Sequence, residues 1–192
     1  MPPDFNFIMQ QLAWLEPESH SISGSTRAAV AMILRKASAG LEMLFIERAA
    51  HERDPWSGHL AFPGGKVEQG EKPRQAAERE TIEEIGLDLN GSVYLGQLAD
   101  IAGANLPVWV SCYVYGMNGS NFTTVLSDEV GDLFWVGFAD LVDAKRHVIA
   151  PVQFADKILD VPAIMLPQPG KPVLWGITYR LVMQLLELFE KR

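Results

Sequence analysis

Residues 62–87 read FPGGKVEQGEKPRQAAERETIEEIGL, and this stretch decides the fold. Pro73 suits the first turn of a helix and Gly86 supplies a stop at its end, while the alanines and glutamates between them favour helix. The spacing therefore predicts a helix over 73–85.

Three carboxylates of this helix, those of Glu80, Glu83 and Glu84, stand at positions i, i+3 and i+4 and leave the same face. Like charges at that spacing repel one another, so something should compensate them. Oxygen ligands alone suit a hard divalent ion such as Mg²⁺ or Mn²⁺, and no cysteine and histidine set favours zinc. The alternative is a solvated acidic face, which is common. The opposite side, with Ile82 and Ile85 flanked by Thr81, can pack against a sheet.

A glycine loop, Phe62-Pro63-Gly64-Gly65, precedes the helix. Glycine adopts turns that a Cβ forbids, so this loop can bring backbone close to a ligand or a metal. Backbone carbonyl groups near the helical carboxylates would complete a metal cage. The loop therefore favours the metal site over a bare acidic surface.

Gly65, Glu71 and the run from Arg79 to Leu87 resemble the Nudix box, GX5EX7REUXEEXGU, in which U is an apolar residue. Every fixed position is filled, and Thr81 at a U position can still pack by its methyl group. The resemblance implies an α/β protein with the Nudix-type α/β/α sandwich, a mixed central sheet and the catalytic loop-helix. It also implies hydrolysis of a nucleoside diphosphate linked to another moiety, by water attacking a phosphorus of the pyrophosphate.

The resemblance also implies roles for individual residues. Mg²⁺ or Mn²⁺ would be bound by the catalytic glutamates and by a carbonyl of the loop, from the set Glu80, Glu83, Glu84 and Gly64, or Gly65. Arg79 and Glu71 would form an ion pair that holds the loop against the helix. Relatives use as general base either a box glutamate or one from a later loop, where Glu129 stands just before an apolar strand; the alternative is an acidic turn residue.

The stretch LFIERAAHERDPWSGHLAFPGG, residues 44–65, is similar to the signature of coenzyme A pyrophosphatases, LLTXR(S/A)X3RX3GX3FPGG. Two features depart from it: Phe45-Ile46 replaces Leu-Thr, and four residues rather than three separate Arg53 from Gly58. Arg48 and Arg53 could grip substrate phosphates, and Trp56 offers a face for an adenine ring. The alternative is an exposed loop in which Arg53 pairs with a neighbouring carboxylate.

The function implied is therefore a Mg²⁺-dependent pyrophosphohydrolase that acts on a small-molecule nucleotide conjugate, with coenzyme A or its derivatives as the first candidate. Hydrolysis of ADP-ribose or of nucleoside diphosphate sugars needs the same metal site and is the alternative. A nucleotide-binding regulator that does not cleave is less favoured, because it has no need of mutually repelling ligands.

Composition limits the class of protein. The chain has 192 residues with 16 basic and 24 acidic side chains, and the net charge of -8 disfavours binding to nucleic acid. No apolar run approaches the roughly 18 residues of a membrane span, so we expect a cytoplasmic protein that does not bind membranes. The single cysteine, Cys112, lies in an apolar alternation and is expected to be a buried thiol.

The remaining pattern indicates two regions, an N-terminal helix and linker over 1–25 and a Nudix hydrolase domain over 26–192. Ile8, Leu12 and Leu15 could form the apolar stripe of the first helix. The stretch 147–172 is rich in proline and apolar residues and is interpreted as edge strands or a dimer arm, so a homodimer is possible. Trp175 is expected in the core. Apolar runs predict strands over 27–36, 41–49, 92–101, 107–117 and 132–138, and a second helix over 176–191.

Overall fold

The central strand of the protein is β1 (Thr26–Ala37), which is buried on both faces. The computed structural model describes residues 4–15, 25–51, 56–103, 107–117, 122–154 and 157–190. Ala31 and Ile33 of β1 point to one side of the sheet, whereas Met32 and Leu34 point to the other. A strand covered on both sides reads as a continuous apolar run rather than an alternation, which explains its sequence AAVAMIL.

The sheet that contains β1 has eight strands and is mixed. Its main order is β3-β2-β1-β7-β5, where β1 and β7 pair in parallel and the other pairs are antiparallel. The strands predicted over 27–36, 41–49, 107–117 and 132–138 are confirmed, whereas the run 92–101 forms two short strands separated by residues 98–100. Their bounds and those of the remaining strands of this sheet are β2 (Gly40–Arg48), β3 (Leu60–Ala61), β4 (Gly64–Lys66), β5 (Val93–Gln97), β6 (Ile101–Ala102), β7 (Val108–Met117) and β8 (Val130–Gly137).

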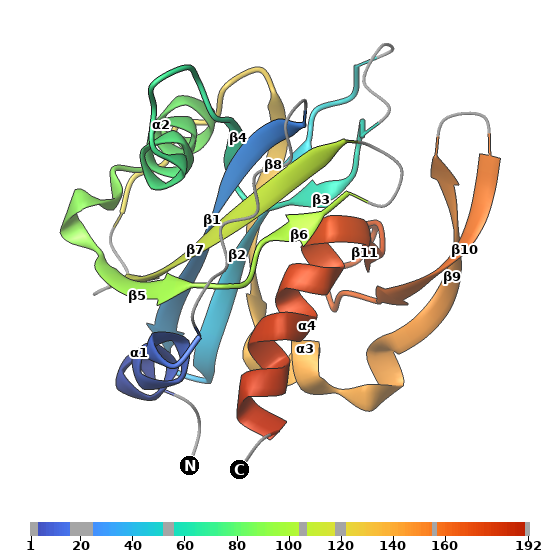
Figure 1. Ribbon diagram of the computed structural model, residues 1–192. Coiled ribbons are helices and arrows are strands. Elements are labelled where there is room, and N and C mark those ends of the chain that lie inside the picture. The colour runs from blue at the N-terminus through green and yellow to red at the C-terminus, as the bar shows by residue number, and fades with distance from the viewer. Residues whose placement is uncertain are drawn as a thin grey trace.

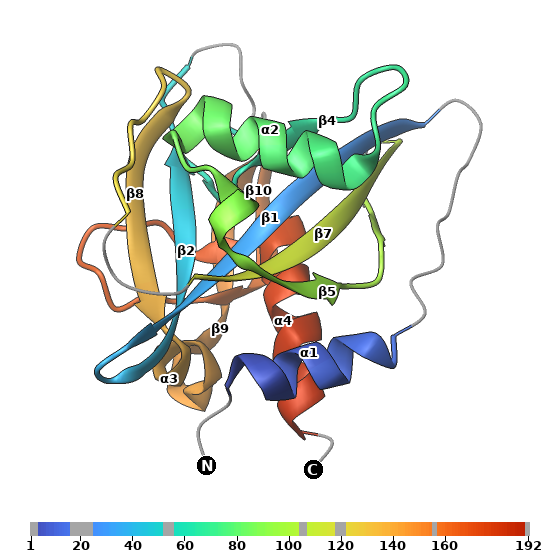
Figure 2. The same cartoon turned by 90° about the vertical axis from the view of Figure 1, so that its left-hand side faces the viewer.

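Helices cover both faces of the sheet (Figures 1 and 2). Helix α2 (Pro73–Ile85) packs on one face, and α1 (Phe5–Ala13) and α4 (Gly176–Glu190) pack on the other. The fold is therefore the α/β/α sandwich with a mixed central sheet that the sequence predicts. Three short helices were not predicted: η1 (Leu89–Gly91), α3 (Phe138–Val142) and η2 (Ala144–Arg146).

Helix α2 has the predicted bounds, and Gly86 ends it in the left-handed conformation, with φ of 69°. The prediction for its inner face was partly wrong. Ile85 is buried, but Ile82 is 47% exposed. Thr81 takes the inner position and donates a hydrogen bond to the Ala77 carbonyl over 2.7 Å. Because residues 77, 81, 84 and 85 share one face, that side contacts the sheet and Ile82 is rotated outward.

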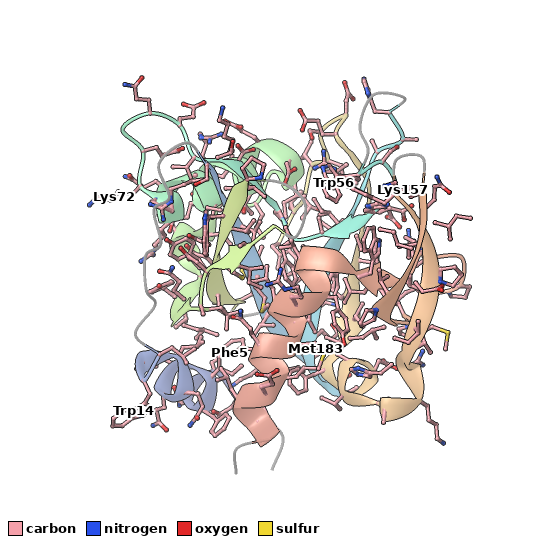
Figure 3. All side chains as sticks on the ribbon, turned by 45° about the vertical axis from the view of Figure 1, so that its right-hand side comes forward. Phe5, Trp14, Trp56, Lys72, Lys157 and Met183 are labelled. Carbon is pink, nitrogen blue, oxygen red and sulfur yellow. The ribbon has the colours of Figure 1, made fainter. Side chains whose placement is uncertain are left out.

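Helix α1 packs its predicted apolar stripe into the core. Ile8 and Leu12 are buried, Leu15 is partly buried against them, and Trp14 is 84% exposed and points away from the fold (Figure 3). Gly96 of β5 lets this helix approach, since a Cβ there would lie 2.6 Å from the Cβ of Leu12. The boundary drawn at residue 25 stays a prediction.

Replacement of Ile8 by alanine should lower the free energy of unfolding by about 2–5 kcal/mol, because it leaves a cavity between α1 and the sheet. Met9→Ala is the matched control, since Met9 is 39% exposed on the same helix. Denaturant titration of both variants measures the difference. Equal stabilities would show that α1 is not part of the cooperative fold.

A second sheet is formed by the segment interpreted as edge strands or a dimer arm. It has the order β11-β10-β9 and contains β9 (His147–Phe154), β10 (Lys157–Ile164) and β11 (Leu174–Trp175). Ile149 and Ile158 are 68% and 72% exposed on this hairpin. The strands are confirmed, and the homodimer stays a prediction that sedimentation measurements can check.

The core buries Cys112 completely, as predicted, and burial raises the pKa of its thiol. A buried thiol with a raised pKa is a poor nucleophile. Among the described residues, no helix is long and apolar enough to cross a membrane.

Candidate active site

The loop before α2 packs against β1, the central strand of the sheet. Strand β4 pairs with β1, where Gly64 lies opposite Val30. Gly64 has a φ of 155°, and a Cβ on it would lie 2.3 Å from the Ala29 carbonyl oxygen. The amide of Gly64 donates a hydrogen bond to the Glu84 carboxylate over 2.9 Å. Glycine is therefore required here, and the loop holds the last carboxylate of the helix.

Glu84 is a buried carboxylate with 5% exposure. Its pKa is raised from 4.5 to about 7, mainly by burial and to a smaller extent by the negative charges of Glu80 and Glu129, while the hydrogen bond from Gly64 and the charge of Arg48 oppose the shift. The ionised form of Glu84 is thus left without enough positive charge around it.

Glu80 lies directly over the backbone of Gly65. A Cβ on Gly65 would lie 2.4 Å from the carboxylate carbon of Glu80, so only glycine leaves room for this side chain in its present place. Burial raises the pKa of Glu80, while the hydrogen bond and charge of Arg79 oppose the shift. Glu80 and Glu84 are therefore both desolvated acids beside the glycine loop.

Arg79 binds the loop to the helix. Its Nε and Nη2 donate to the two carboxylate oxygens of Glu71 over 3.0 and 3.2 Å, which confirms the ion pair implied by the box. Its Nη1 also donates to Glu80 and Glu83 over 2.9 and 3.0 Å, and Nη2 donates to the Lys66 carbonyl. Glu83 is on the outer side of the helix, where its side chain is 57% exposed.

The loop that carries Glu129 is attached to the end of α2. The amides of Val125 and Ser127 donate to the carbonyls of Ile85 and Glu84, each over 2.9 Å. These bonds satisfy carbonyls that the end of a helix leaves open. The charge of Glu129 raises the pKa of both Glu80 and Glu84, so the structure brings it close to the box carboxylates.

The donor set fits a hard divalent cation by its chemistry. Glu80, Glu83 and Glu84 offer only oxygen atoms, and the buried Glu84 and the partly buried Glu80 gain from any added positive charge. Within the described ranges, no three acidic, histidine or cysteine side chains already form a metal cage. The ligands would complete such a cage only if Glu83 and Glu80 exchanged contacts with Arg79 for contacts with the cation.

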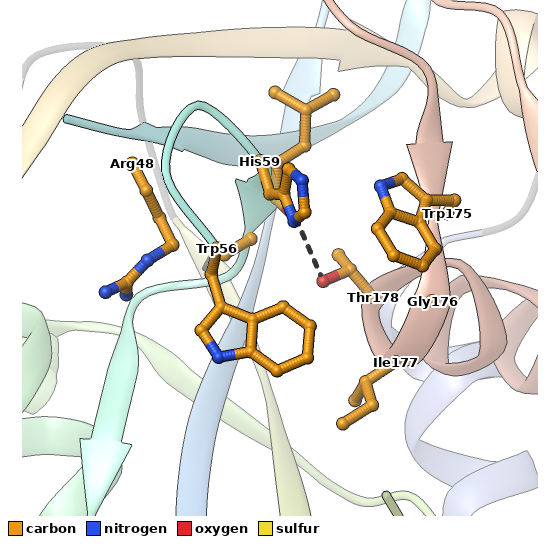
Figure 4. A pocket seen from close by; sticks show the side chains of 9 residues that line it. Arg48, Trp56, His59, Trp175, Gly176, Ile177 and Thr178 are labelled. Atoms are coloured by element: carbon orange, nitrogen blue, oxygen red, sulfur yellow. Dashed lines mark hydrogen bonds between the residues drawn. The ribbon is translucent and has the colours of Figure 1, made fainter. Parts of the chain in front are cut away.

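A pocket of about 220 Å³ lies where the end of β2 and β3 meet β11 and the start of α4 (Figure 4). Trp56 and Trp175 enter it from opposite sides with His59 and Thr178 between them, and Arg48 stands at its rim. The charge of Arg48 also lowers the pKa of Glu84, so this guanidinium acts on the box as well as lining the pocket. The other lining residues are Leu60, Ala61, Gly176 and Ile177.

The aromatic rings around the pocket contact one another across distant parts of the chain. The ring centroids of Trp56 and Phe154 are 4.6 Å apart, and those of His59 and Trp175 are 5.0 Å apart. The placement of Trp175 in the core was therefore wrong, because it is half-buried at this wall. Sequence reasoning missed His59, Phe154 and Thr178; only His59 had a signal, its place in the stretch 44–65.

The structure thus brings together Arg48, Trp56, Gly64, Glu80, Glu84 and Glu129, with Glu83 on the outer rim. Arg53 lies outside the described residues, as do its suggested partners Glu52 and Asp54.

Comparison with known proteins agrees with this geometry. The family model of the NUDIX domain matches residues 25–157. A probable nudix hydrolase of Schizosaccharomyces pombe is 28% identical over 152 residues, which are 79% of this chain and 52% of that protein. This chain spans about half the length of that curated relative and less of the next two.

Solved structures show the same fold. A Caenorhabditis elegans Ap4A hydrolase, in a binary complex, is 26% identical with a TM-score of 0.50 over 61% of this chain and 83% of that one. The NUDIX domain of Shewanella oneidensis NrtR, complexed with ADP ribose, has a TM-score of 0.57 and 18% identity over 94% of this chain and 97% of that one, and shares the fold alone. The box, the sandwich and the family match together identify this chain as a member of the Nudix hydrolase family.

Proposed function

We propose that this protein is a Mg²⁺- or Mn²⁺-dependent pyrophosphohydrolase that cleaves the diphosphate linkage of a nucleoside diphosphate conjugate. The observation that carries the proposal is the pair of desolvated carboxylates, Glu80 and Glu84, held by the glycine loop beside Arg48 and an aromatic pocket. Nudix hydrolases generally use divalent metals. A buried and a partly buried acid, both with raised pKa values, are what such a cation would stabilise.

Glu80, Glu83 and Glu84 would hold the cation, with the carbonyl of Gly64 as a further ligand. When bound, the metal neutralises phosphate oxygens and lowers the pKa of its water. Glu129 would accept a proton from the attacking water, since its loop is anchored to the end of α2 next to the carboxylates. Arg48 would contact a phosphate of the substrate through its guanidinium. Arg53 retains the same role as a proposal from the sequence.

Coenzyme A or one of its derivatives is the first candidate substrate, because residues 44–65 are similar to the coenzyme A signature and contribute Arg48 and Trp56 to the pocket. Trp56 and Trp175 both line the pocket, and the face of an indole ring suits a flat base such as adenine. ADP-ribose and nucleoside diphosphate sugars are the alternative. The Ap4A hydrolase relationship adds dinucleoside polyphosphates to the compounds worth testing.

A substrate panel with product identification tests the proposal. Formation of 3',5'-ADP and phosphopantetheine from coenzyme A supports the first candidate, and formation of AMP and ribose 5-phosphate from ADP-ribose supports the alternative. Each reaction should stop when EDTA removes the cation. Tight binding of a conjugate without turnover of any compound would favour the regulator instead.

Trp56→Leu should raise the KM of the substrate that is turned over about three- to tenfold, the effect expected for loss of one stacking contact. Trp14→Leu is the matched control, because Trp14 is 84% exposed on α1. Steady-state kinetics of both variants measure the difference. An unchanged KM in Trp56→Leu would place the base elsewhere.

A further inference from the structure

Two carboxylates face each other where β2 and β8 pair, just outside the candidate site. Glu47 of β2 lies directly opposite Asp132 of β8 in this antiparallel pair. Like charges directly opposite one another destabilise a sheet. Lys171 lies between them and donates to Glu47 over 2.6 Å and to Asp132 over 2.5 Å. The ammonium group of Lys171 therefore offsets the repulsion that this strand register creates between Glu47 and Asp132.

Lys171 comes from a distant part of the chain. It is 124 residues from Glu47 and 39 from Asp132, in the segment that leads to β11. Its ammonium also lies 4.9 Å from the ring centroid of Phe134, and its side chain is 17% exposed. The hydrogen bond from Lys171 lowers the pKa of Asp132. Glu47 and Asp132 are 28% and 48% exposed, so Lys171 is the most shielded member of the cluster.

The strand pairing changes next to this cluster. Glu47 pairs with Asp132, but Arg48 pairs with Val130, so Gly131 falls between two registered pairs as a β-bulge. Bulges bend a strand and redirect the side chains beside them. Here those side chains are Arg48, at the rim of the pocket, and Glu129, which immediately precedes Val130. The amide of Ala49 donates a hydrogen bond to the Glu129 carbonyl over 2.8 Å, which ties the end of β2 to the residue before β8.

We propose that Lys171 is a positioning residue for hydrolysis: by neutralising Glu47 and Asp132 it fixes the bulge that directs Arg48 and Glu129 toward Glu84. The segment that carries Lys171 also leads to Trp175, so the same interaction holds the far wall of the pocket. The inference rests on the proposed function for its kinetic part, because Arg48 and Glu129 matter to rate only if the protein is a hydrolase. Its structural part stands on the cluster alone.

Lys171→Met removes the charge while keeping the length of the side chain. We expect kcat/KM to fall about tenfold or more, since small displacements of catalytic groups are costly. Lys171→Arg should stay within about threefold of wild type, because it keeps the cation. In the double variant Glu47→Gln with Lys171→Met, Asp132 no longer faces a second negative charge. This variant should therefore recover most of the lost activity. Recovery of the rate would assign the loss to the repulsion between Glu47 and Asp132 rather than to lost packing of the lysine side chain.

Arg35→Met is the matched control, because Arg35 of β1 pairs with Glu42 near the start of β2. Arg35 donates to Glu42 over 2.6 Å in a cross-strand pair with both side chains 24% exposed, and it lies 4.1 Å from the ring centroid of Trp135. This variant should lose stability as Lys171→Met does but keep kcat/KM within about twofold, because Arg35 is remote from the pocket residues.

Indole N–H resonances give a readout that needs no substrate. Lys171→Met should shift the resonances of Trp56 and Trp175, and the double variant should return them toward wild type, whereas Arg35→Met should shift that of Trp135. Absence of turnover in the wild-type protein would end the proposed function but leave this spectroscopic test in place. The inference is overturned if folded Lys171→Met keeps wild-type indole positions, or if the double variant recovers neither spectrum nor rate.

Discussion

Glu84→Gln is expected to lower kcat by about 10³-fold or more, because an amide cannot supply the negative charge that binds and orients a divalent cation. The fold should survive. The amide oxygen of glutamine can still accept the hydrogen bond that Gly64 donates over 2.9 Å, and the substitution removes a charge from a site with 5% exposure. The melting temperature is therefore expected to stay at or above that of the wild type.

Steady-state rates across a Mg²⁺ or Mn²⁺ titration, together with thermal unfolding in EDTA, measure both parts of this expectation. Glu187→Gln is the control, since Glu187 is an exposed carboxylate on α4 that undergoes the same chemical change. A rate near that of the wild type in Glu84→Gln would remove Glu84 from the site. A large fall in melting temperature would instead assign it a structural role.

Gly65→Ala should have the second largest effect, a loss of about 10²-fold in kcat/KM. The added Cβ would lie 2.4 Å from the Glu80 carboxylate carbon. The end of a flexible side chain can move away at little cost, so the carboxylate is displaced while the backbone stays in place. Activity is therefore expected to fall much more than stability.

Gly91→Ala provides the comparison, because a Cβ on Gly91 has open space around it and its backbone is not left-handed. This variant should keep wild-type kinetics. Metal titrations of both variants should show that Gly65→Ala needs a higher cation concentration for half-maximal activity. If Gly65→Ala and Gly91→Ala behave alike, the position of Glu80 against the loop does not matter for catalysis.

Local spacing in the sequence was enough to predict much of the fold. The box gives α2 its bounds, because Pro73 and Gly86 act on the backbone where they stand. Apolar runs also predicted the main strands, because a strand buried on both faces consists of consecutive apolar residues. The ion pair of Arg79 with Glu71 was also implied, as both residues belong to one fixed motif.

The rotation of α2 about its own axis was harder to predict from the sequence. Its periodicity predicts an inner face with Ile82, but in the structure Ile82 is exposed and Glu84 is buried instead. That rotation depends on where β1 and β4 present their surfaces, which no helical pattern contains. The burial of Glu84, and with it the raised pKa, follows from this tertiary contact.

The sequence by itself determined the carboxylates, the glycine loop and the family of this protein, because their chemistry requires fixed residues at short, fixed separations. Only the tertiary structure decided which distant residues line the pocket and which contacts fix them in place. Trp175 reaches the same pocket as Trp56, and Lys171 reaches Glu47 across 124 residues. Such contacts depend on how the second sheet packs against the first, and packing between distant segments leaves no periodic signal in the chain.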